Sequence, residues 1–83
     1  MQQKIEITVH YFAKLRDLTN KEQESFETEI NSTPKDVHRK LKELYDLPEI
    51  SHLKIAVNDS FASWKTELED KDKLVFIPPV TGG

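Results

Sequence analysis

The stretch "STPKDVHRKLKELYDLP", residues 32–48, contains the strongest helix signals in the sequence. Thr33 is a favoured N-cap residue, Pro34 has the fixed φ that suits the first helical position, and Asp36 completes a capping box with Thr33. Pro48 lies where a helix of ordinary length has already ended. The stretch therefore predicts a helix that begins at Pro34.

One apolar stripe runs along this predicted helix. It consists of residues at spacings i, i+4, i+7 and i+8, namely Val37, Leu41, Leu44 and Tyr45. A stripe of this kind faces a hydrophobic core. Residues 13–20 predict only a short helical turn, closed by Asn20, which tolerates the left-handed conformation. A single helix is therefore long enough to cover one face of a sheet.

Alternating apolar and polar residues predict the strands that this helix covers. In "KIEITVHYF", residues 4–12, one face carries Ile5, Ile7, Val9 and Tyr11. Shorter or weaker patterns predict further strands at residues 22–30, at residues 53–57, around Phe61 and Trp64, and at residues 73–77. This order predicts an α+β roll in one domain, residues 1–77, followed by a flexible, extended C-terminal tail, residues 78–83.

The last predicted strand has apolar side chains on both faces. Leu74 and Phe76 alternate with Val75 and Ile77, which is typical of a strand covered on both sides. Because the helix covers only one face, Ile77, with Phe12 and Phe61, is expected on the other. Such residues form either an exposed protein-contact surface or a part of the core that loops cover. The sequence leaves both interpretations open.

Composition excludes several classes of partner. The chain has 83 residues and a formal net charge of −3, without the clustered Lys and Arg that nucleic-acid binding requires. It has no cysteine and no apolar run near the ~18 residues of a membrane span. The N-terminus lacks the apolar stretch of a signal peptide. We therefore expect no nucleic acid, no membrane partner and a cytoplasmic location.

The sequence also offers little chemistry of its own. Its three histidines are dispersed without metal-ligand spacing, which favours ordinary surface or helix-face histidines. Because no glycine precedes residue 82, there is no glycine-rich phosphate loop. We expect no bound metal or cofactor and no autonomous enzyme activity.

The ending "IPPVTGG", residues 77–83, contains both glycines of the chain. Pro78 and Pro79 lack backbone N–H groups and end strand pairing, so the chain should leave the sheet stiffly. Residues 80–83 then extend at most roughly 13–14 Å. Gly82 and Gly83 suit a narrow channel in another protein, where the Gly83 carboxylate could be activated as an acyl-adenylate made from ATP. The alternative is an inert, frayed terminus.

Three segments resemble one known family. "YFAKLRDL" at residues 11–18, "AVN" at 56–58 and "LEDKDKLVFIPPVTGG" at 68–83 are similar to the MoaD family, the small subunits of molybdopterin synthase. The resemblance implies a ubiquitin-like β-grasp fold, with a mixed sheet packed on one main helix. It also implies that an E1-like enzyme uses ATP to adenylate Gly83, which becomes a thiocarboxylate. The sulfur then passes to cyclic pyranopterin monophosphate, forming the molybdopterin dithiolene.

The resemblance further implies a non-catalytic carrier that is active only with a large subunit, in a heterotetramer. Gly83 and Gly82 would form the reactive end. The expected partner interface comprises Phe12, Phe61, Ile77, Pro78, Pro79, Val80 and Thr81.

Two alternatives also use the Gly83 carboxylate: a ubiquitin-like modifier conjugated through Gly83, and a sulfur carrier of another pathway such as thiamine synthesis. A third alternative is a binding module whose tail is inert. One residue departs from the family pattern, since Lys71 in "DKD" stands where members often have glycine. If that turn keeps a positive φ, lysine costs roughly 1–2 kcal/mol there.

Overall fold

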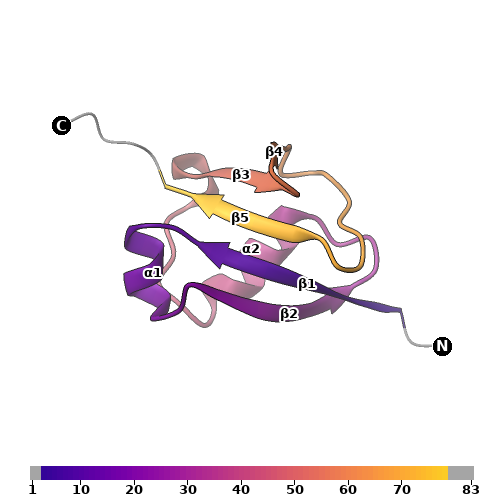
Figure 1. The fold of residues 1–83 in the computed structure, drawn as a ribbon, viewed down its shortest axis with the longest axis horizontal. Coiled ribbons are helices and arrows are strands. Elements are labelled where there is room, and N and C mark those ends of the chain that lie inside the picture. Colours follow the sequence, from indigo (N-terminus) through magenta and orange to yellow (C-terminus); the bar gives the residue numbers. More distant parts are fainter. Residues whose placement is uncertain (1–2, 79–83) are drawn as a thin grey trace.

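The computed structural model describes residues 3–78, which form one sheet with helices beside it (Figure 1). In chain order the elements are β1 (Lys4–Tyr11), α1 (Lys14–Thr19), β2 (Gln23–Glu29), α2 (Pro34–Lys42), a 3₁₀ helix η1 (Ile50–His52), β3 (Lys54–Val57), β4 (Ser60–Phe61) and β5 (Lys73–Ile77). The predicted order of strands and main helix is confirmed. Trp64, expected in the short strand with Phe61, instead lies beyond the end of β4.

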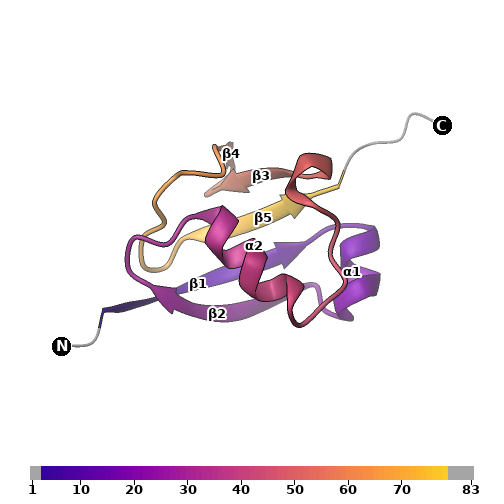
Figure 2. The ribbon, with the colours of Figure 1, turned by 180° about the vertical axis from the view of Figure 1, so that it is seen from behind.

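The five strands form one mixed sheet in the order β2-β1-β5-β3-β4. The first and last strands, β1 and β5, lie side by side at its centre and run parallel, whereas the other neighbours are antiparallel. Helix α2 crosses one face of the sheet, as the view from behind shows (Figure 2). The opposite face, turned towards the viewer in Figure 1, carries no helix. This arrangement confirms the predicted α+β roll.

Helix α2 begins as its sequence predicts. The Thr33 hydroxyl accepts a hydrogen bond from the Asp36 backbone N–H at 3.3 Å, and the Asp36 carboxylate accepts one from the Thr33 backbone N–H at 3.0 Å. Each contact satisfies an N–H group that a helix start leaves without an intrahelical partner. Pro34 occupies the first helical position, where no N–H is needed.

The end of α2 differs from the predicted stripe. The backbone N–H groups of Glu43 and Leu44 donate to carbonyls three residues earlier, so the chain tightens and leaves the helix after Lys42. Leu44 is 68% exposed, and its assignment to the apolar stripe was wrong. Tyr45 packs against the core as predicted. His38, which the pattern omitted, is buried on the core face of α2.

The core lies between α2 and the sheet. The four apolar residues predicted for the inner face of β1 are all buried. They pack with Leu74 and Phe76 of β5 and with Val37 and Leu41 of α2. The strand that leads into the tail is therefore anchored in the centre of the core.

The turns use residues other than glycine where φ is positive. In residues 3–78 these are Ala13, Asn20, Asn31, Asn58, Asp59 and Lys71. Asn and Asp tolerate the left-handed region better than most residues. Asn20 ends α1 in this conformation, as predicted. Asn58 and Asp59 form the two-residue connection between β3 and β4, where both central positions need positive φ.

The turn before β5 does keep a positive φ at Lys71, so this residue adopts the strained left-handed conformation. Its φ is 75°, and its backbone N–H donates to the Glu6 carbonyl at 2.7 Å, which joins the turn before β5 to β1. The side chain itself is exposed. The strain therefore comes from the Cβ atom and not from a side-chain contact.

We expect Lys71→Gly to raise the free energy of unfolding by about 1 kcal/mol. The left-handed region costs a non-glycine residue roughly 1–2 kcal/mol, and the greater freedom of glycine in the unfolded chain offsets part of the gain. Urea denaturation of the two proteins measures the difference. Lys71→Ala is the matched control, because it removes the ammonium but keeps Cβ, and its stability should stay near that of the parent. Equal stabilisation by both substitutions would assign the effect to charge instead.

Candidate functional site

The sheet face opposite α2 brings together side chains from four strands. His10 pairs with Val75, Val75 pairs with Ala56, and Ala56 pairs with Phe61. Residues directly opposite one another point to the same side of a sheet. One row therefore crosses β1, β5, β3 and β4 on the side away from the helix.

A second row lies beside the first, nearer the start of the tail. Ile77, the last residue of β5, pairs with Lys54 of β3. Phe12 directly follows Tyr11, whose partner on β5 is Phe76, so the same register brings Phe12 next to Ile77. We call the apolar members of the two rows the outer face: Phe12, Ala56, Phe61, Val75 and Ile77.

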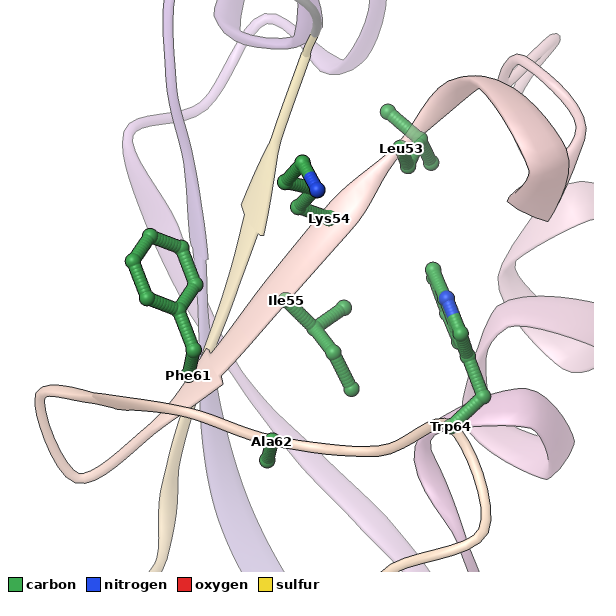
Figure 3. Close-up of a pocket in the computed structure, with 6 residues that line it drawn as sticks. All are labelled: Leu53, Lys54, Ile55, Phe61, Ala62 and Trp64. Atoms are coloured by element: carbon green, nitrogen blue, oxygen red, sulfur yellow. The ribbon is translucent and has the colours of Figure 1, made fainter.

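Exposure decides between the two interpretations of these residues. The Phe61 side chain is 77% exposed and Phe12 is 49% exposed, so no loop within the described residues covers them. Phe61 points away from Ile55 and Trp64, which lie on the other side of β3 (Figure 3). Ile77 is half-buried, and Val75 and Ala56 are more deeply set between their neighbours. The outer face is thus an exposed apolar surface centred on buried small side chains.

The sequence predicted Phe12, Phe61 and Ile77 for this face but did not identify which residues form its centre. The alternation in the last strand placed Val75 on the side of Ile77, and the structure confirms this position. Alternation places Ala56 on the side opposite Leu53 and Ile55, but only its pairing with Phe61 and Val75 puts it at the centre of the face.

Two hollows border the outer face. The first, 430 Å³, lies at the edge of β3 and is lined by Leu53, Lys54, Ile55, Phe61, Ala62 and Trp64 (Figure 3). Lys54 supplies the charge in this lining, and neither a carboxylate nor an imidazole accompanies it. The lining therefore offers no acid–base pair for catalysis.

The second hollow, 370 Å³, lies where the tail begins. It is lined by Ala13, Lys14, Leu15, Leu18, Pro48, His52 and Pro78. Pro78 follows β5 directly and is half-buried. The remaining predicted site residues, Pro79, Val80, Thr81, Gly82 and Gly83, lie outside the described residues.

A polar cluster on the helix side of the sheet was also missed. The Glu24 carboxylate accepts hydrogen bonds from the Tyr11 hydroxyl, from the Tyr45 hydroxyl at 3.0 Å and from the Lys21 ammonium at 3.1 Å. Burial by itself would raise the pKa of Glu24, but these three donors outweigh burial and hold the pKa below its usual value. Burial, reinforced by Glu24, raises the pKa of the Tyr11 phenol. The cluster ties β1 and β2 to the segment after α2.

This lowered pKa predicts a dependence of stability on pH. A carboxyl whose pKa is lower in the folded state contributes its full stabilisation above the unfolded value, near 4.3 for Glu, and loses it as pH falls towards the folded value. Glu24→Gln should therefore lower the free energy of unfolding by about 1 kcal/mol at pH 7, and the difference should shrink below about pH 4. Urea denaturation across this pH range measures it. A difference independent of pH would contradict the role of the charge.

The histidines form no metal site within the part of the chain that the structure describes. His38, expected at the surface or on a helix face, is a core residue whose Nε2 lies 2.8 Å from the Pro48 carbonyl oxygen. Its ring meets Trp64 edge-on at 5.8 Å between centroids. His10 is half-buried on the side of the outer face, and His52 is exposed. Over residues 3–78, no helix has the length and apolar character needed to cross a bilayer.

Solved structures share this fold over nearly the whole chain. The HVO 2177 protein of Haloferax volcanii is 25% identical, with a TM-score of 0.86 over 100% of this chain and 91% of that one. A protein assigned as molybdopterin converting factor subunit 1 from Pyrococcus furiosus is 28% identical, with a TM-score of 0.79 over 92% and 99% of the two chains. Small archaeal modifier protein 1 from Methanosarcina acetivorans is 23% identical, with a TM-score of 0.79 over 96% and 98%.

These similarities confirm the ubiquitin-like β-grasp fold of the sulfur carriers. The sequence itself matches the ThiS family over residues 9–83, a range that includes β1 from Val9 onwards, the outer face and the tail. The chain therefore belongs to the ThiS family.

Proposed function

We propose that this protein is a sulfur carrier whose Gly83 carboxylate is converted to a thiocarboxylate. The observation that carries the proposal is the family match, which extends through Gly82 and Gly83. The fold supports it, because β5 lies at the centre of the sheet and leads to Pro78 beside an exposed apolar face. The tail and the outer face would be presented to a partner together.

The chain's own part in this chemistry is to bind and to position. A carboxylate is a poor acyl donor until it is activated, so an E1-like enzyme would use ATP to form the acyl-adenylate, with release of pyrophosphate. A sulfur nucleophile then displaces AMP. The carrier needs no cofactor of its own for these steps, and the lining of the hollow at the edge of β3 offers no acid–base pair.

We further propose that the carrier serves as the small subunit of molybdopterin synthase, in the cytoplasm. The ending "PPVTGG" and the similarity to the Pyrococcus furiosus protein favour this pathway. The large subunit would cover Phe12, Phe61 and Ile77, and would receive Pro78 to Thr81 with the two glycines in its active site. The assembly would be a heterotetramer that transfers sulfur to cyclic pyranopterin monophosphate.

The similarity to small archaeal modifier protein 1 favours a second candidate, conjugation of Gly83 to lysines of other proteins. The thiamine pathway is a third, since the family match does not distinguish among carriers. Conjugates of high molecular mass that disappear when Gly83 is removed would identify a modifier.

Mass spectrometry tests the central proposal. The protein is incubated with its E1-like enzyme, ATP and a sulfur source, and its intact mass is measured. We expect one oxygen to be replaced by sulfur at Gly83, and addition of the large subunit and the pterin precursor to yield the dithiolene. A carrier that gains sulfur but gives no dithiolene would exclude molybdopterin synthesis while keeping the first proposal. A chain that never gains sulfur would exclude both.

A further inference from the structure

Two lysines flank the start of the tail. Lys54 on β3 pairs directly with Ile77, and Lys14, the first residue of α1, lines the same hollow as Pro78. Figure 1 shows the end of β5 between the start of β3 on one side and α1 on the other. The lysines therefore lie on opposite sides of the point where the chain leaves the sheet.

Neither lysine has an acidic partner in the described part of the chain. The ion pairs found among residues 3–78 use Lys21, Arg39, Lys42 and Lys73. Lys14 and Lys54 are both exposed. Helix α1 also carries Arg16 and Asp17, whose opposite charges offset each other. The two ammonium groups thus add positive charge beside the tail of a chain whose net charge is −3.

A partner that covers the outer face must also accommodate Lys54. Lys54 lies directly beside Ile77 in the sheet, so a protein packed over Ile77 removes water from the lysine as well. An ammonium that loses water without gaining an acceptor is strongly unfavourable. The covering surface must therefore place an acceptor there, and a carboxylate is the acceptor that also compensates the charge. Lys14 lines the same hollow as Pro78, so a protein that also covers the start of the tail meets the same requirement there.

We propose that Lys14 and Lys54 act as a pair that recognises carboxylate side chains at the mouth of the channel receiving the tail. This inference rests on the proposed function, since it requires a protein that accepts the tail. The pair orients an otherwise acidic protein so that its tail meets the channel first. Charges placed in this way act mainly on the rate of association.

Stopped-flow association with the large subunit of molybdopterin synthase from the same organism tests the pair, and the E1-like enzyme is measured in parallel. For the double variant Lys14→Glu, Lys54→Glu, we expect the association rate constant at low ionic strength to fall at least tenfold, and the difference to shrink near 1 M salt. The matched control is Lys4→Glu, Lys35→Glu. It changes net charge equally, at exposed lysines at the start of β1 and on α2. Its rate should change less than about threefold.

The possible outcomes separate the two proposals. Equal losses in both double variants would show that net charge matters and the position of the lysines does not, which overturns the inference but leaves the sulfur carrier intact. An unaltered association rate in the Lys14 and Lys54 variant would likewise overturn the inference and leave the sulfur-carrier proposal intact. A wild-type chain that binds neither protein would overturn both proposals.

Discussion

Deleting Gly83, or adding one residue after it, is expected to reduce sulfur transfer to background. Attack on the terminal carbon needs reacting atoms about 3–3.5 Å apart. A change of one residue moves that carbon by roughly 3.3–3.6 Å along an extended chain. In a channel built for one tail length, a displacement of this size removes the carbon from the reactive position.

The fold should tolerate both changes. The core is built from residues up to Phe76, and β5 ends at Ile77, several positions before the altered end. The melting temperature should therefore stay within the error of the measurement. Thiocarboxylate formation is followed by intact mass and dithiolene formation by product analysis. One extra residue at the N-terminus is the matched control and should leave both reactions unchanged. Normal activity of the C-terminally extended chain would exclude the terminal carboxylate as the sulfur carrier.

Phe61→Asp is expected to abolish co-purification with the large subunit. The side chain is 77% exposed on the outer face, so a partner that covers it would bury the new carboxylate against Val75 and Ala56. Burial of an unpaired charge in an apolar interface costs several kcal/mol, which is enough to raise the dissociation constant by roughly a thousandfold or more.

The isolated domain should be affected far less. Because Phe61 is exposed on a two-residue strand, its replacement removes little packing, and we expect a loss of stability below about 1 kcal/mol. Leu44→Asp is the matched control, since Leu44 is 68% exposed but lies beyond the end of α2, away from the outer face. It should bind normally. If both variants still bind, the outer face is not the interface, and if Phe61→Asp unfolds, Phe61 contributes to the core.

Much of the fold could be predicted because local signals and tertiary packing agree. The capping box at Thr33 and Asp36 formed as expected, and the alternation in β1 placed four side chains in the core. The predictions were wrong where tertiary packing, and not the helical periodicity of the sequence, decides which side chains are buried. Leu44 continues the helical spacing, but the chain leaves the helix two residues earlier. His38 is polar by type, yet the Pro48 carbonyl satisfies its ring nitrogen inside the core.

The candidate site was only partly predictable for a similar reason. An apolar residue on the polar side of a strand, such as Phe12, is visible in one segment alone. The neighbours of Ile77 cannot be recognised from one segment, because they depend on the register in which β3 and β5 pair. The position of Lys54 beside the tail, and of Ala56 at the centre of the outer face, therefore required the folded sheet.

The parallel pairing of β1 and β5 also has a mechanical consequence. Because the two strands run in the same direction, the chain enters β1 at one end of the sheet and leaves β5 at the other. A force that pulls the two ends of the domain apart therefore slides these strands past each other, and loads their hydrogen bonds together instead of opening them one by one. A force applied to the domain through Pro78 is therefore resisted along the length of β5, by its pairing with β1 on one side and β3 on the other.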